Sequence, residues 1–254
     1  MKINQNTFIV TGAASGLGFA TTSHFLSQGA TVIGIDLDTS NEKFTNLQKQ
    51  FPKNLIPKEM DVTENKEVIQ VVRETHKNFG PIGGVINCAG IIIAGFLHSS
   101  KKHYELNQEI FQFMMKVNVL GTFYFCQAYA KVALENKYKQ GVIINISSIS
   151  GEDGGPSLVG YSASKGAILG MTMPLARELG KYGLRVISIL PGFFPSKMES
   201  SMQPKYRNAI IRNSALGRFG TPFEFASLVE GIMKNKYLTG VNLRFNGGTG
   251  VPML

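Results

Sequence analysis

The 254-residue sequence contains little cysteine and no long uninterrupted apolar run. Its two cysteines, Cys88 and Cys126, lie in neither a Cys-x-x-Cys motif nor a cysteine–histidine pattern with ligand spacing. The sequence therefore argues against a zinc site or a disulfide framework, and it favours a reducing compartment. Because no run of about 18 apolar residues occurs, we do not expect a membrane-spanning helix. The four histidines match no metal-binding pattern, so no metal is expected.

Acidic residues are also scarce relative to basic ones, 17 against 26, which gives a formal net charge of +9. A surplus of this sign raises the question of nucleic acid or acidic membranes as partners. The lysines are scattered, however, and they form neither an arginine-rich run nor a basic stretch interleaved with aromatic residues. We therefore do not expect nucleic acid as the primary partner, although small phosphate-bearing ligands suit the charge.

The composition, with 43% hydrophobic residues, allows a substantial core and excludes disordered, collagen-like and coiled-coil proteins. Continuous apolar runs alternate with helical patterns, as is typical of a parallel sheet buried on both faces. The predicted strands cover residues 7–11, 30–35, 55–60, 85–87, 142–146, 185–190 and 241–245. The predicted helices cover residues 16–28, 41–51, 65–79, 107–136, 161–182 and 222–234.

We thus predict an α/β fold. It is a single Rossmann-like domain over residues 1–254, with a doubly wound, mostly parallel seven-stranded sheet and helices on both faces. The nucleotide-binding half is expected at about 1–150, and the catalytic and substrate half at about 151–254.

The first predicted strand leads into a glycine-rich turn, in which Gly12, Gly16 and Gly18 follow the pattern Gly-x-x-x-Gly-x-Gly. Such glycines allow a pyrophosphate to approach the backbone at a helix N-terminus, although an ordinary strand-to-helix turn is the alternative. Asp36 ends the second strand, where a carboxylate accepts hydrogen bonds from the adenosine ribose and repels a 2′-phosphate. The pattern therefore favours NAD over NADP, with a simple turn cap as the alternative role for Asp36.

Two further strand ends carry candidate cofactor contacts. Asp61 and Val62 follow the third strand, within reach of an adenine, and the fourth strand closes with Asn87, Cys88, Ala89 and Gly90. Small residues at that point let the backbone pass beside a cofactor. We interpret Cys88 as a small buried contact rather than a nucleophile, because the sequence offers no nearby base to activate it. Cys126 lies on an apolar helix face and is assigned to the core.

The segment that runs from Tyr161 to Lys165 carries the candidate chemistry. Residues four apart share a helix face, so Lys165 can lie under the Tyr161 hydroxyl. A free phenol has a pKa of about 10, and lowering this pKa to about 7 requires roughly 4 kcal/mol. A neighbouring ammonium and an oxidised nicotinamide would supply that shift, so that Tyr161 acts as the general acid and base of alcohol–ketone interconversion. We expect Ser148 to bind the substrate oxygen, and Asn118, buried in a helix, to need a partner such as a water that feeds protons to Lys165.

Taken in order, these motifs and the pair Pro191-Gly192 resemble the short-chain dehydrogenase/reductase family over nearly the whole chain. Within that family, residues 86–91, 161–166, 170–177 and 217–222 look most like the type-2 3-hydroxyacyl-CoA dehydrogenases. This resemblance implies a homotetrameric NAD enzyme of the mitochondrial matrix that acts on short or branched 3-hydroxyacyl-CoA and tolerates some steroids. Residues 1–6 are shorter than a cleavable presequence, so the alternative compartment is the cytoplasm.

The resemblance also implies individual roles. By position, it implies NAD contacts for Ser15, Leu17, Asp36, Asp61, Val62, Cys88, Tyr161, Lys165, Pro191 and Phe194, and a catalytic set of Asn118, Ser148, Tyr161 and Lys165. Ser196 stands where the family has a threonine that helps to hold the nicotinamide, and it keeps the hydroxyl. Lys101 and Lys102 are placed either against the phosphates of CoA or simply in solvent.

Two alternatives stay open. One is a dehydrogenase of steroids or other secondary alcohols. The other is a subunit of a larger mitochondrial assembly, for example in tRNA processing, with catalysis secondary.

Overall fold

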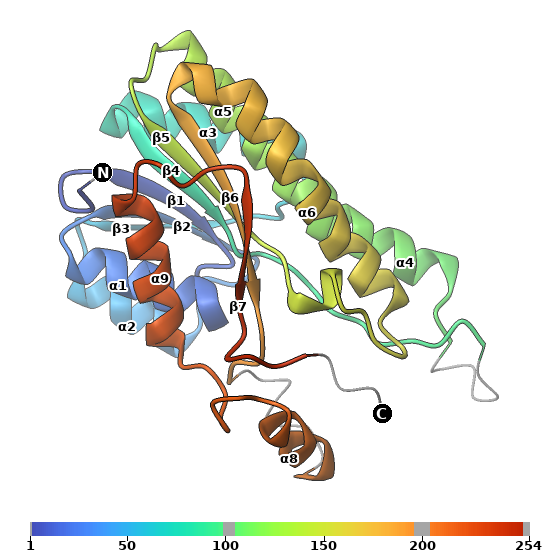
Figure 1. Cartoon of the computed structure of the whole chain (residues 1–254). Coiled ribbons are helices and arrows are strands. Elements are labelled where there is room, and N and C mark those ends of the chain that lie inside the picture. The colour runs from blue at the N-terminus through green and yellow to red at the C-terminus, as the bar shows by residue number, and fades with distance from the viewer. Residues whose placement is uncertain (1, 99–104, 196–203, 251–254) are drawn as a thin grey trace.

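A computed structural model describes residues 2–98, 105–195 and 204–250 of the chain (Figure 1). Its seven strands form one sheet in the order β3-β2-β1-β4-β5-β6-β7, and every neighbouring pair runs parallel. The strands are β1 (Thr7–Thr11), β2 (Thr31–Asp36), β3 (Leu55–Glu59), β4 (Ile82–Asn87), β5 (Gly141–Ile146), β6 (Leu184–Pro191) and β7 (Val241–Phe245). The predicted Rossmann-like fold is confirmed.

Helices cover both faces of the sheet, and each face has its own apolar core (Figure 1). One face carries α1 (Gly16–Ser27), α2 (Glu42–Gln50) and α9 (Pro222–Lys234), with Phe25, Phe44 and Phe225 fully buried. The other carries α3 (Asn65–Phe79), α5 (Thr122–Glu135) and α6 (Val159–Leu179). The strands β1, β4 and β5 are buried along their whole length. This burial explains their continuous apolar sequences.

Local sequence signals set several helix ends. The Thr221 side chain caps α9 by accepting a hydrogen bond from the Glu224 N–H, and the Glu224 side chain accepts one from the Thr221 N–H. Pro222 occupies the first turn. This capping box satisfies backbone donors that a helix start leaves open. At the end of α3, Gly80 has φ of +75°, a conformation that glycine adopts at little cost.

The structure differs from the prediction in two places. The stretch predicted as one helix over 107–136 consists of α4 (Gln108–Met115), a π-helical segment η2 (Lys116–Gly121) and α5. The helix α8 (Pro204–Arg212) was not predicted, since its nine residues contain few apolar side chains and bury only Ile210. In the described part of the chain, no helix is both long and apolar enough to cross a membrane.

Candidate functional site

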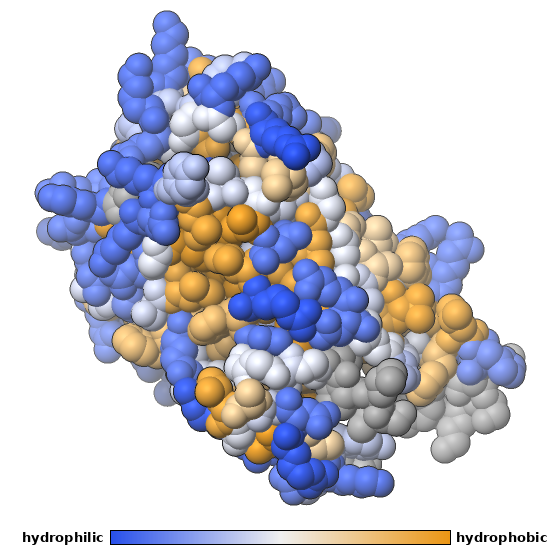
Figure 2. Space-filling view, viewed as in Figure 1, coloured by the Kyte–Doolittle hydropathy of each residue, from blue (hydrophilic) through white to orange (hydrophobic). Residues whose placement is uncertain are grey.

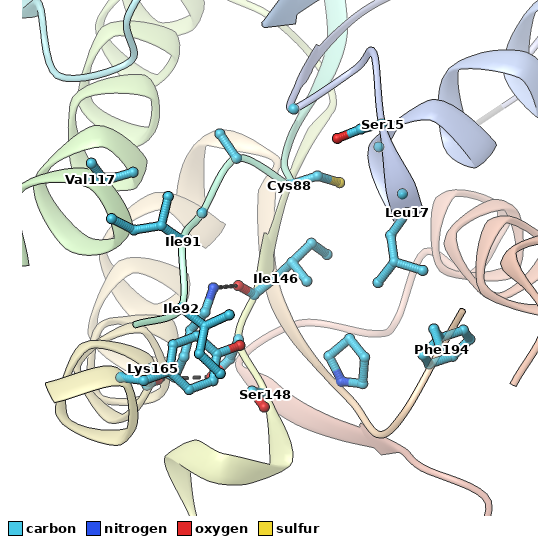
Figure 3. A pocket seen from close by; sticks show the side chains of 18 of the residues that line it. Ser15, Leu17, Cys88, Ile91, Ile92, Val117, Ile146, Ser148, Lys165 and Phe194 are labelled. Carbon is cyan, nitrogen blue, oxygen red and sulfur yellow. Dashed lines mark hydrogen bonds between the residues drawn. The ribbon is translucent and has the colours of Figure 1, made fainter. Parts of the chain in front are cut away.

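A cleft of about 510 Å³ opens at the carboxyl ends of the central strands (Figure 3). Most of the residues predicted to contact a cofactor or substrate line it: Gly12, Ser15, Gly16, Leu17, Gly18, Asp36, Asp61, Val62, Cys88, Ala89, Gly90, Ser148, Tyr161, Lys165, Pro191 and Phe194. They come from the ends of β1 to β6 and from α1 and α6. The cleft therefore gathers residues that lie far apart in the sequence.

The turn between β1 and α1 is shaped for a bound anion. Gly12 and Gly16 have φ of +63° and +51°, and a side chain on Gly18 would overlap the Gly12 carbonyl oxygen. A Cβ on Gly16 would meet nothing within 4 Å, so the backbone there faces open space. Helix α1 has no acidic residue in its first turn, and Ser15 makes no side-chain cap. Its first N–H groups are thus available to a pyrophosphate, which fits a dinucleotide.

The end of the cleft near β2 and β3 is acidic. Asp36 accepts hydrogen bonds from the N–H groups of Ala14 (2.9 Å) and Leu37 (2.8 Å). Asp61 accepts one from the Thr63 N–H (2.8 Å). Among the described residues that line the cleft, Lys165 is the only lysine or arginine. These described lining residues therefore place no cation near Asp36 that could bind a 2′-phosphate.

Lys165 lies on α6 with its Nζ donating to the Ile146 carbonyl (2.8 Å), and it is only 6% exposed (Figure 3). Its Nζ is 5.8 Å from the centroid of the Tyr161 ring. Burial lowers the pKa of Lys165 to about 8, although the charge of a Cys88 thiolate would raise it. Near neutral pH the Lys165 ammonium is therefore only slightly more stable than the neutral amine.

Tyr161 is half-buried, and desolvation raises its pKa above that of a free phenol, while the interaction with Ser148 lowers this pKa by less. We expected Lys165 and an oxidised nicotinamide together to lower the pKa of Tyr161. In this structure, desolvation of the phenolate outweighs the other contributions. Tyr161 is consequently a protonated donor at neutral pH. Ser148 and Tyr161 both line the cleft.

Asn118 lies in η2 and is fully buried, but it does not line the cleft. Its Nδ2 donates to the Ile91 carbonyl (2.8 Å) and to Ser164 Oγ (2.9 Å), and its Oδ1 accepts from the Ile91 N–H (2.8 Å). The expected water partner of this side chain is replaced by protein groups. Asn118 thus ties the π-helical segment to the chain that leaves β4 and to the helix of Tyr161.

Asn87 does not line the cleft either. Its Nδ2 donates to Asn145 Oδ1 (2.8 Å) on the neighbouring strand, beside Cys126 Sγ. Asn87 therefore joins two strands beneath the site rather than facing the cleft. Cys88 lines the cleft, and burial raises the pKa of its thiol to about 12, so it is no nucleophile at neutral pH. Ser196, Lys101 and Lys102 lie outside the described residues.

One wall of the cleft consists of apolar residues outside the predicted set of site residues. They are Ile91, Ile92, Phe113, Val117, Ile149 and Leu158. Figure 3 shows Ile91 and Val117 close together and Ile92 beside Lys165. Their only sequence signal is position, since Ile91 and Ile92 follow Gly90 and Val117 precedes Asn118. The wall suits the apolar part of a substrate.

The chain resembles known dehydrogenases over most of its length. A family described as short chain dehydrogenase matches residues 6–207. The 3-hydroxyacyl-CoA dehydrogenase type-2 of Bos taurus is 36% identical over 244 residues, which cover 94% of this chain and 93% of that protein. The 3-oxoacyl-[acyl-carrier-protein] reductase FabG of Thermotoga maritima is 32% identical over 253 residues, 98% of this chain and 99% of that protein. A crystal structure of a short chain dehydrogenase from Bacillus anthracis matches with a TM-score of 0.86 at 27% identity, covering 98% of this chain and 97% of that one.

Proposed function

Because this chain belongs to the short-chain dehydrogenase family, we propose that it is an NAD-dependent enzyme that interconverts 3-hydroxyacyl-CoA and 3-ketoacyl-CoA. Membership makes it an oxidoreductase with a nicotinamide cofactor and a small-molecule substrate. The observation that carries the proposal is that Ser148, Tyr161 and Lys165 line the same cleft as the glycine turn, with Lys165 Nζ 5.8 Å from the centroid of the Tyr161 ring.

The residues present fit a dinucleotide. The α1 N-terminus would hold the pyrophosphate, Asp36 the adenosine ribose, and Asp61 with Val62 the adenine. Cys88, Pro191 and Phe194 would border the nicotinamide. When bound, the nicotinamide supplies or accepts the hydride.

The chain's own residues move the proton. Ser148 holds the substrate oxygen, and Tyr161 donates its proton to that oxygen during ketone reduction. The raised pKa of Tyr161 keeps this proton in place at neutral pH. In alcohol oxidation Tyr161 must instead be deprotonated, so the rate of oxidation rises with pH. Lys165 places a positive charge next to the phenolate that forms.

Two observations support the finer assignments. The carboxylate of Asp36, with no lysine or arginine beside it among the described residues of the cleft, favours NAD over NADP. The apolar wall suits an acyl chain, and relatives named for 3-hydroxyacyl-CoA and 3-oxoacyl substrates are similar to this chain in sequence over most of its length.

The test is reduction of acetoacetyl-CoA by purified protein, followed by the absorbance of NADH, with NADPH in parallel. We expect turnover with NADH and little with NADPH. Tyr161→Phe should lower kcat by about 100-fold or more, because it removes the proton donor, while the Kd of NADH stays within about twofold. Tyr182→Phe is the matched control, since Tyr182 is 44% exposed and outside the cleft. Unchanged kcat in Tyr161→Phe would contradict the assigned role.

The same assay separates the second candidate function, a dehydrogenase of steroids or other secondary alcohols, which the apolar wall also favours. NADH binding without reduction of acetoacetyl-CoA, together with turnover of a steroid, would select it. A role as a subunit of a larger assembly is supported only by the net charge of +9. Co-purification with RNA or other proteins at moderate salt, with neither turnover nor NADH binding, would favour that role.

Homotetramer formation and location in the mitochondrial matrix are also part of the proposal. An apolar area over α9 and β7 supports assembly (Figure 2). The partly buried apolar side chains of these two elements include Leu228, Val241 and Leu243. Sedimentation of the purified protein tests the first, and cell fractionation tests the second.

A further inference from the structure

The loop between Ser148 and Tyr161 forms part of the apolar wall, and local backbone hydrogen bonds shape it. The N–H groups of residues 151–154 donate to the carbonyls of residues 148–150. It contains the short 3-10 helix η3 (Ile149–Gly151) and a turn in which the Leu158 N–H donates to the Gly155 carbonyl (3.1 Å). Among the described residues, one backbone hydrogen bond joins the loop to a distant segment, from the Gly95 N–H to the Ser157 carbonyl (2.8 Å). In the described part of the chain, the hydrogen bonds that join the middle of the loop to distant segments therefore come from side chains.

Arg244 of β7 supplies those contacts. Its Nη1 donates to Glu152 Oε2 (2.7 Å) and to Asp153 Oδ1 (2.8 Å), and its Nη2 donates to Asp153 Oδ2 (2.8 Å). The side chain of Arg244 is 38% exposed and that of Asp153 is 25% exposed. The rigid guanidinium fork holds both oxygens of Asp153 and a second carboxylate at once, a geometry that a lysine cannot reproduce.

The residue next to Arg244 supports the opposite side of the cleft. The Phe245 carbonyl accepts a hydrogen bond from the Gly192 N–H (3.0 Å). The Phe245 ring stacks on Phe194, with centroids 6.0 Å apart and an angle of 26°. Gly192 and Phe194 both line the cleft. Of two consecutive residues of β7, one thus contacts the loop that carries Ile149 and Leu158, and the next contacts Gly192 and Phe194 of the cleft.

A movement of the loop would directly shift the groups that take part in the reaction. The Ser150 N–H donates to Ser148 Oγ (3.1 Å), so the orientation of that hydroxyl depends on the loop backbone. Gly151 packs against α6, where a Cβ would come within 2.9 Å of the carbonyl carbon of Lys165. Ile149 and Leu158 at the two ends of the loop line the cleft.

We propose that Arg244 is a positioning residue, which orders the loop at Glu152 and Asp153 and thereby sets the geometry of Ser148 and of the apolar wall. This inference rests on the proposed function, because it assigns that wall to the substrate. An exposed ion pair contributes little to global stability. The distinguishing property of Arg244 is that it joins the substrate wall to the strand that supports the cofactor wall.

The experiment compares Arg244→Gln with Arg73→Gln. Arg73 is the matched control, since it pairs with Glu135 (3.9 Å) between α3 and α5, has a 56% exposed side chain and does not line the cleft. Hydrogen–deuterium exchange of peptides covering residues 149–158 reports on the loop. Kinetics of acetoacetyl-CoA reduction and the Kd of NADH report on the site.

We expect Arg244→Gln to speed exchange in this loop about tenfold and to lower kcat about tenfold, because a small displacement of positioned groups is costly. The Kd of NADH and the Tm should change no more than in Arg73→Gln. Arg244→Lys should recover part of the lost kcat. Unchanged exchange in the loop overturns the inference, whether or not the wild type reduces acetoacetyl-CoA. Faster exchange with unchanged kcat overturns it as well. If the wild type fails to reduce acetoacetyl-CoA while Arg244→Gln loosens the loop, the assigned substrate has failed and the ordering role of Arg244 stands.

Discussion

Lys165 is an ammonium that the fold holds almost out of water, and this has a measurable cost. The side chain is 6% exposed, and the Ile146 carbonyl is its one hydrogen-bond acceptor among the described residues. Burial lowers its pKa from 10.5 to about 8. We predict that Lys165→Met removes a penalty that depends on pH in a definite direction.

The magnitude follows from the pKa. A lowering of this size corresponds to about 3 kcal/mol, since each pKa unit is worth about 1.4 kcal/mol. Between the folded pKa of about 8 and the unfolded value of 10.5, the unfolded chain binds more protons at this site. The contribution of Lys165 to the free energy of unfolding therefore rises with pH across that window. Below it, the full penalty applies.

The assay is urea unfolding of wild type and Lys165→Met, without cofactor, at a series of pH values from about 7 to 10.5. The wild type should gain about 3 kcal/mol relative to the variant across the series. The unpaired Ile146 carbonyl lowers the stability of the variant by about 1–3 kcal/mol. This loss is the same at every pH, so it leaves the slope unchanged. Lys131→Met, at an exposed position of α5, is the control. Parallel curves for wild type and Lys165→Met would refute the reasoning.

Two further substitutions test the site. Asp36→Ala should weaken NADH binding about 100-fold, since it removes two charge-assisted hydrogen bonds to the adenosine ribose, worth about 1.5 kcal/mol each. It should also reduce the preference for NADH over NADPH. Fluorescence titration of both cofactors measures this, and NADH affinity within threefold of wild type would contradict it. Gly90→Ala should lower kcat about tenfold and stability by about 1–3 kcal/mol, because its Cβ would lie 3.2 Å from Asn118 Oδ1 and 3.3 Å from Lys165 Nζ. Gly170→Ala is its control, with nothing within 4 Å of the added Cβ, and should stabilise α6 by about 1 kcal/mol; equal unfolding and kinetics in the two variants would argue against the steric account.

Several features of the site needed only local sequence. The Tyr161 and Lys165 side chains share one face because helix geometry brings residues four apart together. The glycine turn was predictable because close backbone approach and positive φ are local demands, and Gly12 and Gly16 meet them. The parallel sheet followed from continuous apolar runs, since strands covered on both faces have no polar side. These predictions concern neighbours in the chain or the burial of whole segments.

The partners of Asn118 and the direction of the Tyr161 pKa were beyond that reasoning. Asn118 bonds Ile91, 27 residues away, and Ser164, 46 residues away. The pKa of Tyr161 depends on how far packing excludes water, and this desolvation outweighs the opposing effect of Ser148 on the pKa. Sequence spacing carries no information on either quantity.

What the sequence determined by itself is the set of chemical groups and their order along the chain: a glycine turn, an acid after the second strand, and a serine, tyrosine and lysine for proton transfer. The tertiary structure decided which groups meet. It turned Asn87 toward Asn145, assembled an apolar wall from separate segments, and brought Arg244 to Asp153 across 91 residues. Contacts of this kind depend on strand order and on the packing of helices over the sheet, because only the closed fold places the ends of distant segments within hydrogen-bond distance.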